Sequence, residues 1–130
     1  MKRPNVLAFL LCENASKDRD GKVSLQSIFD RILMPRTPKS QKNFFVYYKM
    51  VVSEPCAVAL RITHLVHSEI SELNNWRESF SQPGLVQGVF RLSTGRFVPG
   101  SYEFELVQVN GGSQPISLAT MRFVVDQQEE

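Results

Sequence analysis

Short apolar segments, separated by turn residues about every ten positions, are the feature of this sequence that most constrains its fold. In the clearest segment Tyr102, Phe104 and Leu106 alternate with polar residues, as in a strand with one face in water. No helical pattern of about 10–15 residues lies between the segments, which excludes a sheet built from βαβ units. The chain has 14 valines and only 5 alanines. This bias also favours strands, because Val suits a pleated sheet and Ala suits a helix.

We therefore predict an all-β protein, an immunoglobulin-like antiparallel β-sandwich of about seven strands with at most one short helix. The strands are expected at residues 6–12, 23–33, 44–52, 56–66, 85–92, 101–106 and 117–125. The irregular, polar residues 67–81 are the one place where a short helix is allowed. A length of 130 residues fits a single sandwich domain at residues 1–126, with a polar C-terminal tail at residues 127–130.

Two details of the strand pattern have more than one interpretation. Asp20-Gly21 is a strong hairpin signal that needs a second arm, so residues 23–33 are expected as a strand with a bulge near Gln26. A short helix is the alternative, because residues 25, 28, 29 and 32 have helical spacing. Tyr102 follows Gly100 by two residues and resembles the tyrosine corner of immunoglobulin-like sandwiches. The alternative for Tyr102 is an ordinary aromatic core residue.

Three stretches of the chain are similar to segments of a known family. They are Cys12-Glu13-Asn14-Ala15, the hairpin Asp20-Gly21-Lys22 with residues 24–32, and Phe97-Val98-Pro99-Gly100-Ser101-Tyr102. The family that they resemble is an uncharacterised one of short bacterial proteins, known as a domain of unknown function. The resemblance covers most of the chain, although residues 68–81 match poorly. It implies a β-sandwich in the bacterial cytoplasm, and it brings no catalytic residues with it.

The N-terminus has a basic start, an apolar run and Cys12, which together suggest a lipoprotein signal. The run of about seven residues is short for a signal core, and Leu11 stands where cleavage needs a small residue. We therefore expect residues 6–12 to be a buried first strand. An even count permits a disulfide between Cys12 and Cys56, but a protein without a signal peptide favours two buried, reduced thiols. Because no apolar stretch approaches the roughly 20 residues that span a bilayer, we expect no membrane segment and a cytoplasmic protein.

The common catalytic and metal motifs are absent from the sequence, which has no G-x-S-x-G, no P-loop and no G-x-G-x-x-G. His64, His67 and Glu69 come closest to a metal cluster, but a strand places His64 and His67 on opposite faces. His64 is therefore expected in the core. Apolar surroundings raise the pKa of a thiol, so Cys12 and Cys56 are expected to be unreactive. We predict a protein that is not an enzyme, with no cofactor and no metal.

Two groups of residues are candidates for partner binding. The first is a loop with four cations and no acid between them: Arg31, Arg36, Lys39 and Lys42. An anionic partner would suit such a patch, whereas the lack of interleaved aromatic residues argues against nucleic acid, and a solvated loop is the alternative. The second group is Trp76 with Arg77, because both residue types are enriched at interface hot spots. The alternative is that Trp76 closes one end of the sandwich.

The net charge of +2 is too small to indicate nucleic-acid or membrane binding. It is the sum of a positive region at residues 31–42 and acidic regions at residues 69–78 and in the tail, and such opposite patches suit a protein partner. We therefore expect a non-enzymatic, cytoplasmic interaction or assembly module that binds another protein or associates with itself. A module for a small ligand, either a carbohydrate or an anion, is the alternative. The third possibility is an unrecognised enzyme that uses Asp30, His67 or Glu69.

Overall fold

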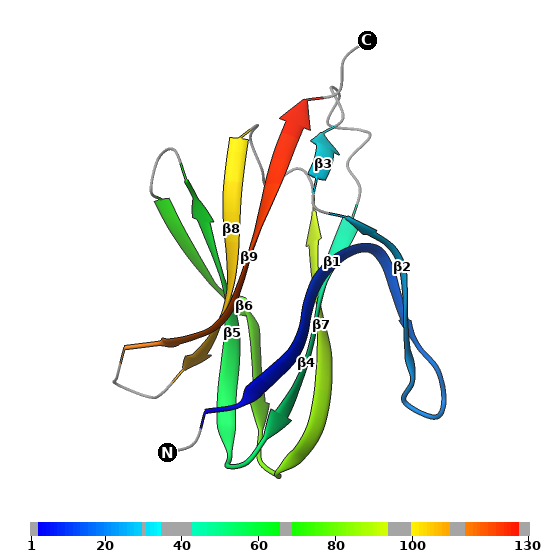
Figure 1. Ribbon diagram of the computed structural model, residues 1–130, viewed down its shortest axis with the longest axis vertical. Coiled ribbons are helices and arrows are strands. Elements are labelled where there is room, and N and C mark those ends of the chain that lie inside the picture. Colours follow the sequence, from blue (N-terminus) through cyan, green and yellow to red (C-terminus); the bar gives the residue numbers. More distant parts are fainter. Residues whose placement is uncertain are drawn as a thin grey trace.

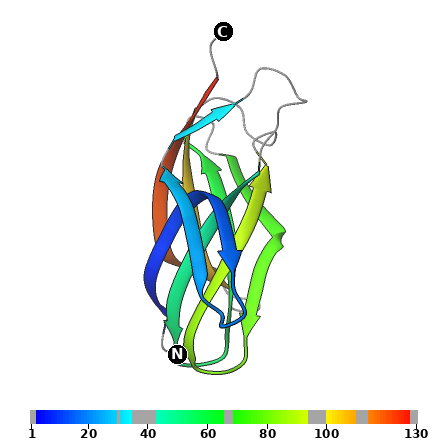
Figure 2. The same ribbon diagram turned by 90° about the vertical axis from the view of Figure 1, so that its right-hand side faces the viewer.

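The computed structural model describes residues 3–29, 31–34, 43–65, 69–93, 100–109 and 114–127, and all regular elements in these ranges are β-strands (Figure 1). The strands form two sheets that pack face to face (Figure 2). This arrangement confirms the predicted all-β fold and the β-sandwich. The structure does not test the finer prediction of an immunoglobulin-like sandwich.

Nine strands are shared between the two sheets in the part of the chain that the structure describes. The four-stranded sheet has the order β2 (Val23–Phe29), β1 (Asn5–Lys17), β4 (Asn43–Val52), β7 (Gly84–Ser93). The five-stranded sheet has the order β3 (Arg31–Met34), β9 (Ile116–Gln127), β8 (Gly100–Val109), β5 (Cys56–His64), β6 (Glu69–Phe80). Short β3 pairs in parallel with β9, whereas the other pairings of the described strands are antiparallel.

The predicted single strand at residues 23–33 is wrong, because this segment forms β2 and β3, which belong to different sheets. The expected bulge near Gln26 and the alternative helix are also wrong. β2 stays in one register with β1 from the pair Lys17 and Val23 to the pair Leu11 and Phe29. The apolar alternation of β2 breaks instead at Ile28 and Phe29, which pair with Cys12 and Leu11 of β1. At these two residues β1 also begins to pair with β4 on its other side, because that pairing ends at Cys12.

A strand, β6, replaces the irregular segment and the short helix that were expected at residues 67–81. Its pairing with β5 changes register, because Ala59 faces Arg77 whereas Arg61 faces Glu72. Extra residues of β6 therefore lie between two regular stretches of the ladder. Such an irregularity breaks the alternation of period two that marks a strand in a sequence, which explains why this strand was missed.

The core lies between the inner faces of the two sheets and is rich in aromatic rings. Alternate residues of β4, from Phe44 to Val52, are almost fully buried, as are alternate residues of β5 from Val58 to His64. The Phe104 ring lies between the sheets, with ring centroids 6.4 Å from Phe44 and 4.1 Å from Phe123. The predicted core position of His64 is therefore confirmed, and its ring packs edge-on against Tyr102.

Tyr102 is a core residue that stacks on Phe123 and contacts His64, with ring centroids 5.3 and 4.6 Å away. Gly100 precedes it with φ = 148°, a conformation that favours glycine. A Cβ at Gly100 would also lie 2.7 Å from Nε2 of His64. The glycine at this position is thus required by its backbone and by the neighbouring imidazole. The tyrosine corner itself stays a prediction.

Both cysteines are free thiols, with Cys12 buried and Cys56 half-buried. Burial raises the pKa of each thiol above its ordinary value, as predicted, and this reduces the reactive thiolate fraction at neutral pH. At the C-terminus, β9 extends to Gln127, which pairs with Met34. Residues 128–130 lie outside the described residues. No helix in the described ranges has the length and apolar character needed to cross a membrane.

Candidate functional site

The two candidate groups predicted from the sequence are only partly described by the structure. Arg36, Lys39 and Lys42 lie outside the described residues, as does Asp30. Arg31 belongs to β3 and pairs with Val124, whereas Trp76 and Arg77 belong to β6. β3 and β6 are the two opposite edges of the five-stranded sheet, so the described backbone does not bring Arg31 close to Trp76 and Arg77.

Of the side chains in these two groups, the structure describes only that of Arg77, which is exposed. His67, from the possible metal cluster, also lies outside the described residues. Glu69 pairs with His64 across β5 and β6, and its backbone alone is described. Among the described residues, no three His, Cys, Asp or Glu side chains are grouped closely enough to hold a metal ion.

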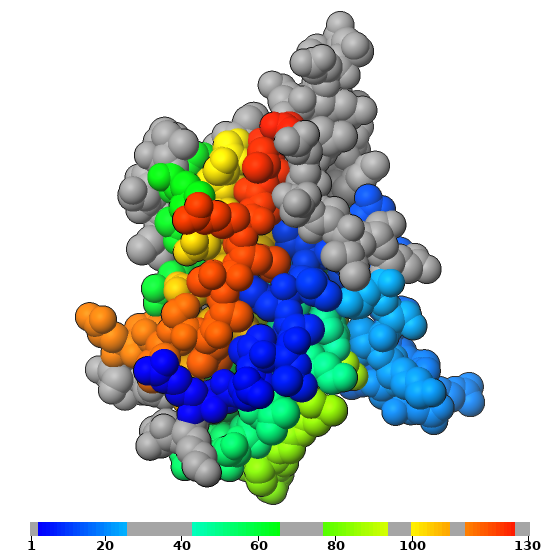
Figure 3. Space-filling model, in the orientation of Figure 1, coloured from blue at the N-terminus to red at the C-terminus, as the bar shows by residue number. Residues whose placement is uncertain are grey.

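A different part of the molecule, the hairpin of β1 and β2, has the geometry of a binding site. β1 pairs with β4 only up to Cys12, whereas its pairing with β2 continues to Lys17. Residues 13–25, which we call the arm, therefore leave the sheet and turn back over the outer face of β4 and β7 (Figure 2). The tip of the arm projects from the side of the sandwich (Figure 3).

The tip of the arm is closed by a compact turn. The Asp18 carboxylate accepts hydrogen bonds of 2.9 Å from the backbone N–H groups of Asp20 and Lys22. Gly21 has φ = 82°, the left-handed conformation that the Asp20-Gly21 pair predicts for a hairpin turn. The predicted hairpin is therefore confirmed, and it places the carbonyl group of Gly21 toward the sheet, where it meets Gln87.

A relay of two hydrogen bonds ties the arm to the sheet. The Tyr47 hydroxyl donates to Oε1 of Gln87 over 2.7 Å, and Nε2 of Gln87 donates to the Gly21 carbonyl over 2.8 Å. Tyr47 lies on the outer face of β4, yet only 7% of it is exposed. This burial raises the pKa of Tyr47 further above its ordinary value, which already leaves the phenol protonated as a donor at neutral pH. We call these contacts the Gln87 relay.

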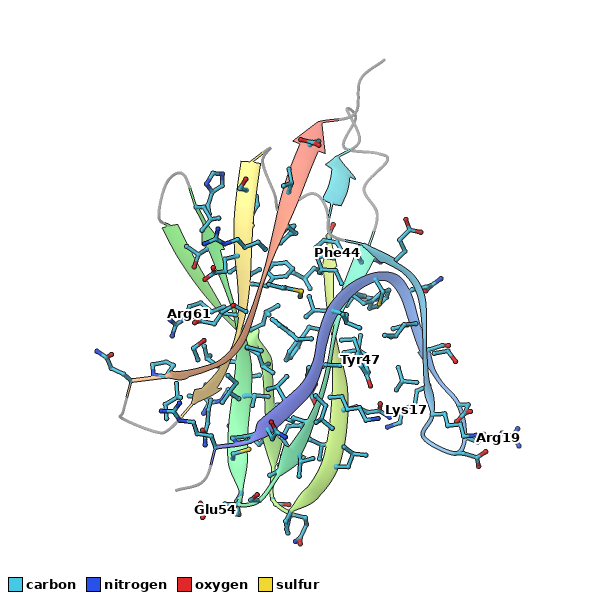
Figure 4. All side chains as sticks on the ribbon, in the orientation of Figure 1. Lys17, Arg19, Phe44, Tyr47, Glu54 and Arg61 are labelled. Atoms are coloured by element: carbon cyan, nitrogen blue, oxygen red, sulfur yellow. The ribbon has the colours of Figure 1, made fainter. Side chains whose placement is uncertain are left out.

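A groove of about 450 Å³ lies between the arm and the sheet. Its walls combine apolar and polar groups from five strands, β1, β2, β4, β6 and β7: Ala15, Ser16, Lys17, Val23, Phe45, Glu78, Gln87, Gly88, Val89 and Arg91. Lys17 and Tyr47 point toward each other across this space, whereas Arg19 lies on the outer side of the tip (Figure 4). The groove is thus formed only because the arm bends away from the sheet.

At the β7 side of the groove, a buried tyrosine fills the space above a glycine. Tyr48 faces Gly88 across the strand pair, and its hydroxyl lies beside Glu78 of the other sheet. Burial first, and the negative charge of Glu78 second, raise the pKa of Tyr48 far above its ordinary value. Tyr48 is therefore a neutral, structural phenol at every physiological pH.

Below the arm, the outer face of the four-stranded sheet has a row of exposed apolar residues. Leu7, Val51 and Leu85 are 52%, 39% and 62% exposed. Val51 pairs with Leu85 on one side and with Asn5 on the other, and Leu7 lies two residues beyond Asn5, at the bulge between Val6 and Ala8. We call these three residues the apolar row. By contrast, the outer face of the five-stranded sheet has ion pairs such as Arg61 with Glu105, 3.2 Å apart.

Sequence reasoning missed the groove and the apolar row, although one local signal was available. Strict alternation along β4 places Tyr47 on the outer face, where a large aromatic residue needs cover. Nothing in the sequence indicates that Gly21 provides that cover through Gln87, which is 66 residues away.

Comparison with known proteins adds no relative. No protein-family model matches the chain, and no curated protein is similar to it. The resemblance to an uncharacterised bacterial family therefore stays a prediction, and functional inference depends on the geometry of the site.

The Gln87 relay gives a prediction for the arm. Gln87→Glu replaces the donor to the Gly21 carbonyl by an oxygen, so the arm is expected to detach more often from the sheet. Trypsin cleavage after Lys17, Arg19 or Lys22 should then be faster by about tenfold, because cleavage follows the open population. Gln82→Glu, an equal charge change on the exposed β6–β7 connection, is the control. Equal cleavage rates in the two variants would show that the relay does not hold the arm.

Proposed function

We propose that this protein is a non-enzymatic interaction module that binds another protein through the outer face of its four-stranded sheet. The apolar row carries the proposal. Exposed apolar residues that are grouped on one face mark interaction surfaces, whereas scattered ones do not. Leu85 pairs with Val51, and Leu7 lies on the neighbouring strand β1, two residues beyond the Asn5 that pairs with Val51. Leu85 is the most exposed of the large apolar residues described.

The edge formed by β7 supports the same surface. β7 makes ten consecutive pairs with β4 from Gly84 to Ser93, and the described residues include no strand on its other side. β7 contains neither Pro nor Lys, the residues that commonly protect an edge from pairing. An extended segment of a partner would add to this edge as a fifth strand, with its backbone bonded to β7 and an apolar side chain against Leu85.

Several observations favour an interaction module over an enzyme. Both thiols have raised pKa values, which lowers the fraction present as reactive thiolate, and the Tyr47 and Tyr48 phenols remain protonated. The strand order, with a β4–β5 connection that crosses between sheets, is compatible with the immunoglobulin-like architecture that we infer for this sandwich. The free cysteines are consistent with the cytoplasmic location that we propose.

The experiment compares two immobilised variants that each introduce one positive charge at an exposed leucine. Leu85→Lys alters the apolar row, whereas Leu65→Lys alters a residue at the end of β5 on the other sheet. A protein retained from the native host by the wild type and by Leu65→Lys, but lost with Leu85→Lys, is then purified and titrated. We expect Leu85→Lys to weaken its binding by at least about tenfold, as for a hot-spot residue.

Three results would overturn the proposal. Equal binding by the two leucine variants would remove the apolar row from the interface. Self-association in sedimentation experiments that Leu85→Lys abolishes would replace the separate partner by a second copy of the chain. A monomer that retains no partner and turns over a substrate would place the protein among enzymes.

A further inference from the structure

The groove beneath the arm is separate from the apolar row and has the dimensions of a small-molecule site. Its volume of about 450 Å³ lies within the range of roughly 300–1,000 Å³ that is usual for ligand pockets. Phe45 and Val89 of the sheet and Val23 of the arm give it apolar walls on two opposite sides. Such walls favour a ligand with an apolar body, because burying it releases water from both surfaces.

The charge of the groove is distributed unevenly. Lys17 points from the arm into the space opposite Tyr47 (Figure 4), and no described carboxylate lies within ion-pair distance of Lys17. Glu78, the acid of the lining, is instead placed beside the buried hydroxyl of Tyr48. Arg91, the second cation of the lining, lies on the β7 side and is engaged in another interaction. The arm side of the groove therefore offers a positive charge next to apolar walls, and this combination is complementary to a single anionic group on an apolar body.

Two polar side chains on the sheet side of the groove are already engaged in holding the arm. Tyr47 donates to Gln87, and Gln87 donates to the Gly21 carbonyl. A neutral polar ligand would have to replace these bonds, whereas an anion beside Lys17 would leave them intact. This difference favours a carboxylate over a carbohydrate, since sugar recognition needs several donors and acceptors that are free to bond.

We propose that the groove binds a small carboxylate with an apolar body, whose anionic group pairs with Lys17 and whose body packs against Phe45 and Val89. The arm covers the ligand from the outside, and the Gln87 relay holds the arm at the distance that the ligand requires. The proposal is independent of partner binding at the apolar row. It adds a second site to the same sheet face.

The test uses two probes of equal shape, 1-naphthoate and 1-naphthamide, titrated into the ¹⁵N-labelled protein and followed by NMR. We expect 1-naphthoate to shift the amide signals of the arm and of β7 around Gln87. We also expect it to bind about three- to fivefold more tightly than the neutral amide, the effect of one partly exposed ion pair. In Lys17→Gln this preference for the carboxylate should be lost, whereas 1-naphthamide should bind as before.

Arg19→Gln is the matched control, because Arg19 is a cation of the same hairpin that lies outside the groove. It should keep the preference for 1-naphthoate, and Leu85→Lys should keep it as well, so failure at the apolar row is distinguishable from failure here. Equal affinity of the two probes, a preference that survives Lys17→Gln, or shifts confined to another surface would each overturn the proposal.

Discussion

Replacing Phe104 by alanine is expected to lower the free energy of unfolding by about 3–5 kcal/mol, the usual cost of removing a buried phenyl ring. Phe104 is completely buried at the centre of the sandwich. Its ring stacks with Phe44 of the four-stranded sheet and contacts Phe123 of its own sheet, with centroids 6.4 and 4.1 Å away. The alanine variant therefore loses apolar burial and leaves a cavity between the sheets.

Urea unfolding monitored by circular dichroism measures this loss. Phe104→Leu keeps most of the side-chain volume, so its loss of unfolding free energy should be about 1–3 kcal/mol smaller than that of Phe104→Ala. Val51→Ala, at an exposed position, should change stability by less than about 0.5 kcal/mol. If Phe104→Ala were no more costly than Val51→Ala, the ring would not join the two sheets as described.

Replacing Gly88 by alanine is expected to cost about 2–3 kcal/mol, although alanine is normally the better residue inside a strand. Gly88 faces Tyr48 across β4 and β7. A Cβ at Gly88 would lie 2.6 Å from Cε1 of Tyr48 and closer still to its Cζ and hydroxyl oxygen. The ring has no room to move, because it stacks on Phe90 at 5.3 Å and meets the edge of Phe80 at 6.5 Å.

A double-mutant cycle separates this overlap from a general intolerance of alanine. In a Tyr48→Val background the ring is absent, so adding Gly88→Ala should be neutral or should stabilise the protein by about 0.5–1 kcal/mol. The reversal of sign between the two backgrounds is the diagnostic result. An equal cost in both backgrounds would mean that the backbone of Gly88, and not its contact with Tyr48, requires glycine.

Much of the sandwich could be predicted because its main signals are local. Tyr102, Phe104 and Leu106 alternate in the sequence and are all buried in β8. The Asp20-Gly21 pair likewise predicts a turn that depends on a few neighbouring residues. The split between β2 and β3, and the irregular ladder of β6, depend instead on pairing with distant strands. Such partners are set by the whole fold, so local periodicity could not find them.

The candidate site was less predictable than the fold. An unusual composition marks two segments in the sequence as candidates, the charged loop at residues 31–42 and Trp76 with Arg77. The groove, by contrast, is built from common residues. Lys17, Tyr47 and Gln87 come from three strands and meet only because the arm bends over the sheet. The apolar row likewise becomes visible only when the register of β1, β4 and β7 is known.

The parallel pairing of β3 with β9 has a consequence for synthesis of the chain. Residues 31–34 of β3 bond to residues 124–127 of β9, and β9 also separates β3 from β8 in the sheet. Until residues 116–127 have left the ribosome, β3 lacks its partner β9, and the side of β8 that β9 pairs with is uncovered. Exposed strand edges of this kind promote aggregation. The nascent protein therefore exposes these two strand edges until β9 emerges.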